Sequence, residues 1–459
     1  MTLIKNGLAL PLDEDAGPFD RSYPADVLIE GTRISAIEPN LNAPDADVID
    51  AAGCLVMPGF VDTHRHVWQT QLRAICADWS LKEYMRGIRF QRGKIYRPED
   101  VYVGNYAGML EALNAGVTTV CDFSHCINSP EHADAAIRGL RDSGGRAMFG
   151  YGFNDVPLDM PYFKGLTPHI ELLRRLRKEQ FSSANGSVTL GVSLSDMMVG
   201  GREQARAEVE AARELGCRMT IHTNCFKSPD AFSEIEVLRE RHLMGPDLLF
   251  VHVNQATDDE LKAVVDSGGS ISVTPETEMQ MGMGRPVTGR FLAAGGKPTF
   301  GADIISGGSG DLFFHMRLGL QAQRMLDNDP ILASGFSPET IALSTRTALK
   351  AATVWGAEAM GLGSQIGTLT VGKQADLILI RLDDINTMPV NDPVATVVMH
   401  AHPGNVDSVL VAGKVLKRNG RLTAEMTRVR LMVRESQEQL LAALAEVQAT
   451  IPSTYRFKN

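Results

Sequence analysis

The chain contains near its start the stretch PGFVDTHRH, residues 58–66, in which an apolar run ends in two histidines one residue apart. In an extended strand, residues i and i+2 point to the same side, so His64 and His66 can direct both imidazoles at one point. Two neutral imidazoles that converge are typical ligands of a transition metal, and zinc suits them best. The plain alternative is a solvated strand end with two polar residues, and the rest of the chain decides between them.

Length and composition indicate a large globular protein. The chain has 459 residues, which allows a barrel of about 250 residues or more and one smaller domain. Hydrophobic residues make up 44% and charged residues 22%, an ordinary balance for a folded protein. The net charge of −10 argues against binding to nucleic acid or an anionic membrane, since such surfaces need clustered Lys and Arg. We therefore expect a small-molecule substrate.

Cysteine usage and the N-terminus indicate the compartment. None of the six cysteines forms a Cys-x-x-Cys pair, so neither a disulfide framework nor a structural zinc knuckle is indicated. Residues 1–10 lack a charged leader and a small-residue cleavage site, and no run of 18 apolar residues occurs. We expect a cytoplasmic protein that assembles as a homo-oligomer.

Both ends of the chain show the same pattern of short strands. Residues 1–57 contain β-rich runs separated by turns, and similar runs return at 372–380 and 406–415. We therefore expect a small composite β-sandwich domain from residues 1–57 and 364–425. A C-terminal helical segment should follow at 426–459.

Residues 58–363 alternate between apolar β-rich segments and helical patterns, as is typical of βα units on a parallel sheet. Eight such units close into a (β/α)₈ TIM-type barrel of the α/β class, whose active site lies at the C-terminal ends of the strands. The predicted strands are residues 55–62, 117–123, 146–152, 188–195, 218–223, 248–253, 270–274 and 298–302.

Polar residues stand at several of these strand ends. His64 and His66 follow the first strand, His222 lies in the fifth, His252 in the sixth, and Asp303 follows the eighth. Each alone has a plain alternative, such as a hydrogen-bonded structural histidine or a helix N-cap aspartate. Together they offer nitrogen and oxygen ligands for a mononuclear zinc-type site with room for a water.

These motifs resemble those of the amidohydrolase superfamily. Residues 58–66 are similar to its strand-one signature, and the likeness continues through 281–286 (MGMGRP), 301–303 (GAD) and 367–377 (GTLTVGKQADL). Their order and spacing resemble the cytosine deaminase-like branch, which includes guanine and 8-oxoguanine deaminases and the triazine hydrolases.

The resemblance implies one divalent metal held by His64, His66, His222 and Asp303, with His252 polarising or orienting the bound water or substrate. The fourth predicted strand lacks the lysine that two-metal members carry there, so one metal is expected. Zinc is the first choice, with iron, cobalt and manganese as alternatives. Asp303 and His252 are the predicted catalytic residues.

One position departs from the family pattern. Deaminases of this branch usually carry a glutamate three residues after the fifth-strand histidine, which shuttles a proton to the ring nitrogen. Here that position is Cys225. A thiol cannot take the water proton as a carboxylate does, so another group must handle protons, and Asp303 is a candidate.

Five further residues near the strand ends are candidates for substrate binding. Gln69 stands where related deaminases place a substrate-binding glutamine, and His125 follows the second strand. Glu276 and Glu278 lie in the predicted turn after the seventh strand, where glutamates are ordinarily solvated. The candidates are Trp68, Gln69, His125, Glu276 and Glu278.

The sequence therefore predicts a metal-dependent hydrolase of non-peptide carbon–nitrogen bonds. A metal-bound hydroxide would attack an amide, urea or carbamate type of substrate, because the proton-shuttling glutamate is missing. Deamination of a purine, pterin or triazine type of heterocycle is the alternative. A metal-free assembly scaffold is a third hypothesis, although the intact ligand set opposes it.

Overall fold

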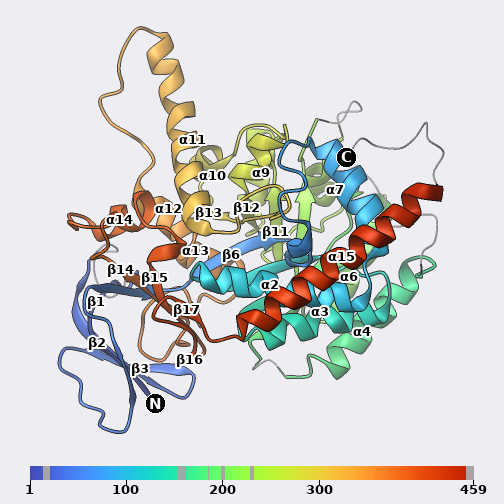
Figure 1. Cartoon of the computed structure of the whole chain (residues 1–459). Coiled ribbons are helices and arrows are strands. Elements are labelled where there is room, and N and C mark those ends of the chain that lie inside the picture. Colours follow the sequence, from blue (N-terminus) through green and yellow to red (C-terminus); the bar gives the residue numbers. More distant parts are fainter. Residues whose placement is uncertain (14–20, 154–161, 184–185, 198–201, 228–231, 451–459) are drawn as a thin grey trace.

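The computed structural model describes residues 1–13, 21–153, 162–183, 186–197, 202–227 and 232–450 (Figure 1). Its described strands form two sheets, one of eight and one of nine strands. Figure 1 shows the eight-stranded sheet surrounded by helices, with the nine-stranded sheet to one side of it. Within the described ranges no helix is long and apolar enough to cross a membrane.

The eight-stranded sheet is the barrel, and all its strand pairs run parallel in sequence order. The first and last strands are joined by hydrogen bonds from Asp303 N to His64 O (2.8 Å) and from His66 N to Asp303 O (2.8 Å). The strands are β6 (Phe60–Arg65), β7 (Val117–Ser124), β8 (Arg146–Gly152), β9 (Val188–Ser193), β10 (Arg218–Thr223), β11 (Leu248–His252), β12 (Ser270–Val273) and β13 (Pro298–Phe300).

The first predicted strand, residues 55–62, was wrong as a single element. The structure divides it at Gly59 into β5 (Cys54–Pro58), which belongs to the nine-stranded sheet, and β6, which opens the barrel. A Cβ atom on Gly59 would lie 2.2 Å from the Thr118 side chain, so only glycine fits where the chain passes between the sheets. Strands β9, β11, β12 and β13 also end one or two residues earlier than predicted.

The nine-stranded sheet combines both ends of the chain. β5 lies between β1 and β14, so it joins the N-terminal strands to the C-terminal ones. Ile4, Val27, Val56 and Leu379 share a core of their own, separate from the barrel core. The composite domain and the fold class are therefore confirmed, while its boundaries at 57, 364 and 425 stay a prediction. The other strands are β1 (Thr2–Ala9), β2 (Tyr23–Glu30), β3 (Arg33–Glu38), β4 (Asp47–Asp50), β14 (Leu377–Arg381), β15 (Val406–Val411), β16 (Lys414–Arg418) and β17 (Arg421–Leu422).

An ion pair inside the protein connects the two sheets. Arg146, at the start of β8, donates from Nε to Asp376 Oδ2 (2.6 Å) and from Nη2 to Asp376 Oδ1 (3.0 Å). Asp376 lies just before β14 and also accepts from Ala412 N at 2.8 Å. Both partners are buried, so the pair is shielded from solvent and fixes how the sheets meet.

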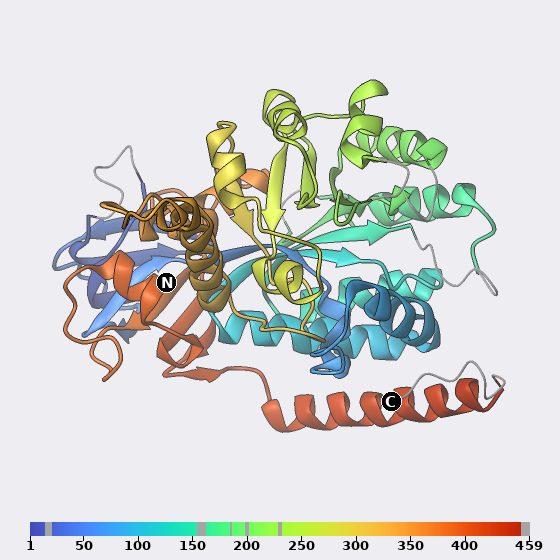
Figure 2. The ribbon, with the colours of Figure 1, turned by 90° about the horizontal axis from the view of Figure 1, so that it is seen from above.

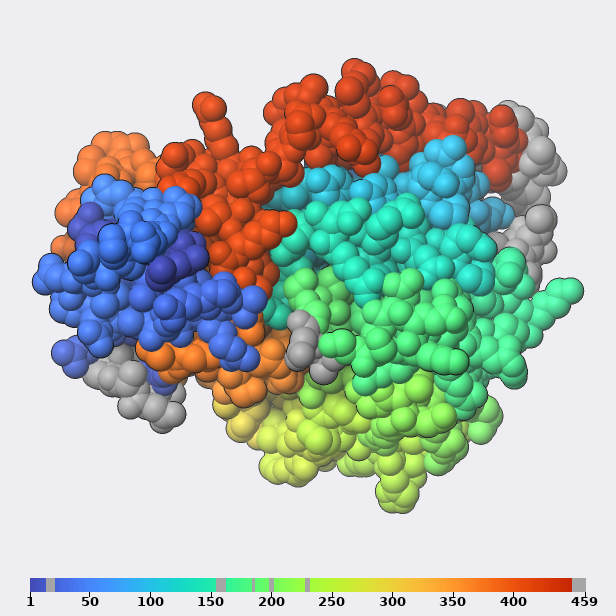
Figure 3. All heavy atoms as spheres, turned by 90° about the horizontal axis from the view of Figure 1, so that it is seen from below, coloured from blue at the N-terminus to red at the C-terminus, as the bar shows by residue number. Residues whose placement is uncertain are grey.

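Helices cover the outside of the barrel. The long C-terminal helix α15 (Met426–Thr450) lies along the outside of α2 (Pro98–Asn114), as Figures 2 and 3 show. Ser436 on α15 donates to Asp100 Oδ1 at 2.7 Å, which fixes the helix against α2. The other helices are η2 (Val67–Leu72), α1 (Leu81–Tyr84), η3 (Met85–Arg92), η4 (Gly93–Ile95), α3 (Pro130–Asp142), α4 (Leu166–Glu179), α6 (Arg202–Glu214), α7 (Glu234–Glu240), α8 (Asp258–Asp266), α9 (Pro275–Gln280), α10 (Thr288–Ala293), α11 (Leu312–Ala333), α12 (Thr345–Ala351), α13 (Val354–Ala359), α14 (Pro393–Met399) and η5 (Pro403–Asn405).

Candidate metal centre

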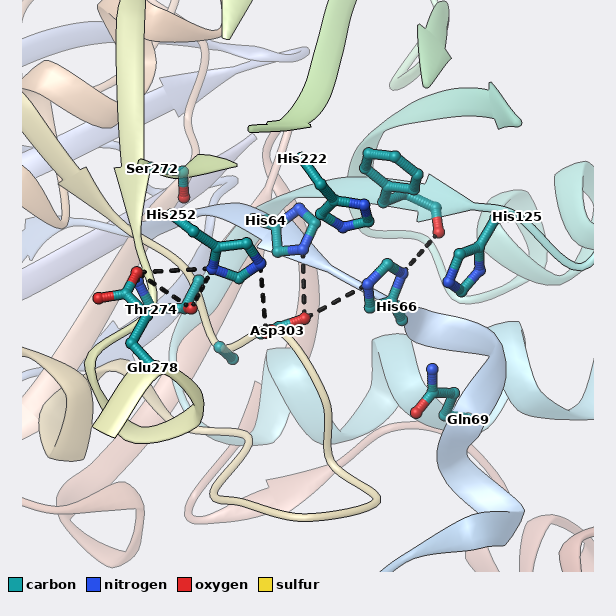
Figure 4. Close-up of polar contacts among 12 residues, drawn as sticks. His64, His66, Gln69, His125, His222, His252, Ser272, Thr274, Glu278 and Asp303 are labelled. Atoms are coloured by element: carbon teal, nitrogen blue, oxygen red, sulfur yellow. Dashed lines mark hydrogen bonds and ion pairs between the residues drawn. The ribbon is translucent and has the colours of Figure 1, made fainter. Parts of the chain in front are cut away.

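The four predicted metal ligands and His252 meet at the C-terminal mouth of the barrel (Figure 4). Asp303 Oδ1 lies 3.2 Å from His64 Nε2 and 3.3 Å from His66 Nε2. The ligand atoms of His64, His66 and Asp303 all lie within 4.8 Å of one another, and so do those of His64, His222 and His252. Side chains that are up to 239 residues apart in the sequence therefore lie together, as their positions at the strand ends predicted.

The hydrogen bonds around the histidines fit a metal at this point. His66 Nδ1 donates to the carbonyl oxygen of Phe123 at 3.0 Å, and His222 Nδ1 donates to Asp196 Oδ1 at 2.8 Å. An Nδ1 proton held by an oxygen leaves the Nε2 lone pair for a metal, which is the usual arrangement of ligating histidines. The donor set of three imidazoles and one carboxylate therefore suits a single divalent ion.

The protonation states also suit metal binding. Burial lowers the pKa of His64 to about 4 and holds the pKa of His66 well below its usual value, so both rings are neutral. Burial acts to raise the pKa of Asp303, but the hydrogen bond from His64 and the neighbouring His252 lower it below its usual value. Asp303 is therefore an ionised carboxylate beside neutral imidazoles.

The backbone is strained where it delivers these groups. His252 (φ 72°), Val253 (φ 50°) and Asp303 (φ 59°) all adopt the left-handed region, which non-glycine residues rarely occupy. A β-branched residue such as Val253 is especially unfavourable there. Strain of this kind costs about 1–3 kcal/mol per residue and is concentrated at functional sites.

His252 is held from behind by residues of the seventh strand and the helix after it. Thr274 Oγ1 lies 3.0 Å and Glu278 Oε1 lies 3.5 Å from His252 Nδ1, while His252 Nε2 lies 3.9 Å from Asp303 Oδ2. Burial acts against protonation of His252, but its hydrogen bond to Glu278 and the charge of Asp303 raise its pKa. The expectation of a solvated turn was wrong for Glu278, because the segment forms α9 and turns this side chain fully inward.

A cavity of about 770 Å³ opens onto the metal ligands. His66, His222, His252 and Asp303 line its metal-facing part, and Cys225 lines it beside them. Burial holds the pKa of the Cys225 thiol well above its usual value, so the thiol is neutral. Several apolar side chains complete the wall: Leu81, Met85, Phe90, Phe226, Phe232, Met281, Met283 and Ile304.

The predicted substrate-binding residues lie mostly behind the cavity wall. Trp68 is 1% exposed and donates from Nε1 to His125 Nδ1 at 3.0 Å, while His125 stacks on His66 with ring centroids 4.1 Å apart. Gln69 Nε2 donates to the Tyr84 hydroxyl at 2.8 Å, and Glu276 accepts from Ser309 N at 2.6 Å. The described residues that line the cavity do not include any of the five candidates, namely Trp68, Gln69, His125, Glu276 and Glu278. Their roles stay predictions.

Three further residues of the cavity were missed from the sequence: Tyr84, Arg89 and Asp196. Asp196 holds His222 and also accepts from Arg89 Nη1 at 3.3 Å. It lies three residues after the end of β9, so the rule that found the other strand-end residues could have found it. Tyr84 and Arg89 lie in the short helices between β6 and α2, where the sequence carries no comparable signal.

A (β/α)₈ barrel with a histidine and aspartate cluster at its C-terminal mouth defines a metal-dependent hydrolase. The model of the amidohydrolase family matches residues 55–416, and the chain belongs to this family. It is a hydrolase of carbon–nitrogen bonds other than peptide bonds, which confirms the predicted enzyme class.

Two curated relatives are similar to most of the chain. The chain is 27% identical to a 5-methylthioadenosine/S-adenosylhomocysteine deaminase of Acetivibrio thermocellus, over 86% of this chain and 88% of the relative. It is 27% identical to a 5'-deoxyadenosine deaminase of Methanosarcina acetivorans, over 96% and 98%.

Two crystal structures share the fold at lower identity. One is an adenosine deaminase from Xanthomonas campestris with bound zinc (TM-score 0.82, 22% identity, 96% of this chain and 98% of that chain). The other is the atrazine chlorohydrolase TrzN from Arthrobacter aurescens with zinc (TM-score 0.80, 22% identity, 95% and 100%).

Proposed function

We propose that the enzyme binds one zinc ion through His64, His66, His222 and Asp303 and hydrolyses an amide, urea or carbamate type of substrate. The observation that carries this proposal is Cys225, a neutral thiol in the cavity wall beside the metal ligands. Deamination of a heterocycle needs a group that protonates the ring nitrogen, and the resemblance assigns that task to a glutamate at this position. An acyl carbon with a carbonyl oxygen needs no such protonation before attack.

The bound metal would supply a Lewis acid that makes water nucleophilic near neutral pH. Asp303 would accept the proton of the attacking water and pass it to the departing nitrogen. His252 would stabilise the negative charge that develops on the substrate oxygen. The products are then an amine or ammonia together with a carboxylate from an amide, a carbamate from a urea or a carbonate monoester from a carbamate.

Tyr84 is a further candidate for contact with the substrate oxygen. Its hydroxyl oxygen accepts from Gln69 Nε2 at 2.8 Å, and Gln69 in turn accepts from Ser306 Oγ at 2.6 Å. The hydroxyl hydrogen of Tyr84 is therefore left to donate, and Tyr84 lines the cavity. Gln69, predicted to bind substrate directly, would then act by orienting Tyr84.

Deamination of an aminated heterocycle is the second candidate function, and the names of the curated relatives favour it. Both are deaminases of adenosine-type compounds. The metal-free scaffold has less support, because it does not explain why the four predicted ligands lie together. A cytoplasmic location and assembly as a homo-oligomer stay predictions.

Substituting Cys225 tests the choice between the two functions. If the enzyme acts on acyl carbons, Cys225→Glu places an unneeded negative charge beside Asp303 and should lower kcat/KM on ureas, carbamates or anilides by about tenfold or more. Cys225→Gln adds similar bulk without charge and is the matched control, expected to lose less activity. The measurement is kcat/KM of the three proteins on this panel and on aminopurines and aminotriazines. Deamination that appears or rises in Cys225→Glu would overturn the proposal.

A further inference from the structure

Glu278 is a carboxylic acid buried directly behind the metal site. It lies on α9, and its side chain is 0% exposed. Its Oε1 atom accepts from the backbone N of Thr274 at 2.8 Å, whereas Oε2 has no hydrogen-bond partner among the described residues. Removing such a group from water is costly unless other groups hold it. One backbone hydrogen bond at the start of a six-residue helix does not offset the free energy that burying the carboxyl group costs.

The Thr274 hydroxyl contacts both this carboxylate and the ring of His252, and Glu278 Oε1 itself lies 3.5 Å from His252 Nδ1 (Figure 4). Its Oγ1 atom lies 3.4 Å from Glu278 Oε1 and 3.0 Å from His252 Nδ1. The Thr274 hydroxyl donates its hydrogen to Glu278 Oε1. The hydroxyl oxygen is then left to accept from His252 Nδ1–H. The three groups form a relay in which each donor meets an acceptor.

The relay determines which ring nitrogen of His252 points into the cavity. With Nδ1 donating to Thr274, the Nε2 atom of His252 faces the cavity, 3.9 Å from Asp303 Oδ2. The left-handed backbone at His252 and Val253 places the ring over the site, so the relay and the strained turn act on the same side chain. An aspartate controls a histidine in the same way in serine hydrolases.

We propose that Glu278 is a positioning residue that acts through Thr274 to hold the His252 imidazole in the Nδ1–H form with Nε2 toward the substrate. The proposal rests on the role of His252 in the hydrolysis proposed above, but it holds for either class of substrate. The competing explanation is that Glu278 only caps α9. Glu260 provides a matched control for that explanation, because it is also buried and accepts from the backbone N of Thr257 at 2.6 Å at the start of α8.

The kinetic test compares Glu278→Gln, Thr274→Val and the double variant with Glu260→Gln, each loaded with zinc. We expect kcat to fall about 10- to 100-fold in both single variants with KM changed less than about threefold, as for other residues that orient groups at metal sites. Because both residues act through one relay, the double variant should be no slower than the slower single variant. Zinc content should match wild type in all four proteins. A Glu278→Gln loss no larger than that of Glu260→Gln, or additive losses in the double variant, would contradict the proposal.

A second readout needs no turnover. The ¹⁵N spectrum of histidine side chains in the zinc-loaded protein, with His252 assigned from a His252→Asn variant, should show a proton on Nδ1 of His252. In Glu278→Gln the amide can donate to Thr274, so the Nδ1–H form should lose its preference. A wild-type ring protonated on Nε2 alone, or one unchanged in Glu278→Gln, would overturn the relay. If the relay is found but the best substrate is an aminated heterocycle, only the proposed function fails.

Discussion

Replacing His64 and His66 together by alanine should reduce bound zinc from about one ion per chain to near zero and turnover by at least about 10⁴-fold, since the metal activates the attacking water. The two imidazoles supply half of the four predicted ligands, and both lie within 3.3 Å of Asp303. Without them, one histidine and one carboxylate remain, which is too few for a tight structural or catalytic zinc site. Metal analysis of the purified protein and kcat/KM on one substrate measure both effects.

Substitution of an exposed histidine is the control, because it removes an imidazole far from the predicted metal ligands. His400 lies at the end of α14 on the surface, so His400→Ala should keep both metal and activity. Far-ultraviolet circular dichroism of the double variant should resemble that of wild type, because the barrel core does not depend on the two rings. Two tightly bound ions per wild-type chain, or undiminished turnover without His64 and His66, would contradict the assignment of the site.

Substituting Asp376→Ala should lower the free energy of unfolding by about 3–5 kcal/mol, the usual cost of leaving one partner of a buried ion pair unpaired. The change removes both hydrogen bonds to Arg146 and leaves the Ala412 N–H without its acceptor. The effect should be large because Arg146 cannot lose its charge and is buried between the two sheets. Denaturant unfolding monitored by fluorescence measures the change.

The pair between Arg174 and Glu214 is the control for this substitution. It has a comparable length of 2.7 Å but lies on the surface, with both side chains more than half exposed. Surface pairs gain little stability, because water competes for both charges. Glu214→Ala should therefore leave the unfolding midpoint unchanged. An Asp376→Ala midpoint equally unchanged would show that the ion pair does not hold the two sheets together.

The sequence predicted the barrel and its cluster because both follow from a local rule. Apolar strands alternate with helices, and polar residues such as His222 and Asp303 stand at the strand ends, which a parallel barrel brings to one mouth. The division at Gly59 was not predictable in the same way. The apolar run continues through it, and only the contact with Thr118 shows that the chain leaves one sheet and enters the other.

The side chains that contact the predicted metal ligands and His252 from behind could not be derived from the sequence, because their contacts join elements far apart in the chain. Whether Glu278 is solvated or buried depends on how α9 turns after β12, and the sequence alone does not fix that turn. Arg89 reaches Asp196 from a helix 107 residues away, and no local pattern pairs the two. Gln69 was identified by its position, yet its contacts with Tyr84 and Ser306 depend on three separate elements. Contacts between loops are set by packing rather than by periodicity.

The measurement that tests the proposed chemistry most directly is the kcat/KM of the zinc-loaded wild-type enzyme on two panels of substrates. One panel contains ureas, carbamates and anilides, and the other contains adenosine-type nucleosides, aminopurines and aminotriazines. We expect a value above about 10⁴ M⁻¹s⁻¹, within the ordinary range of enzymes, on a member of the first panel and at least about 100-fold less on the second. Efficient deamination on the second panel, above about 10⁴ M⁻¹s⁻¹, would contradict the proposed substrate class and show that another group protonates the ring in place of Cys225.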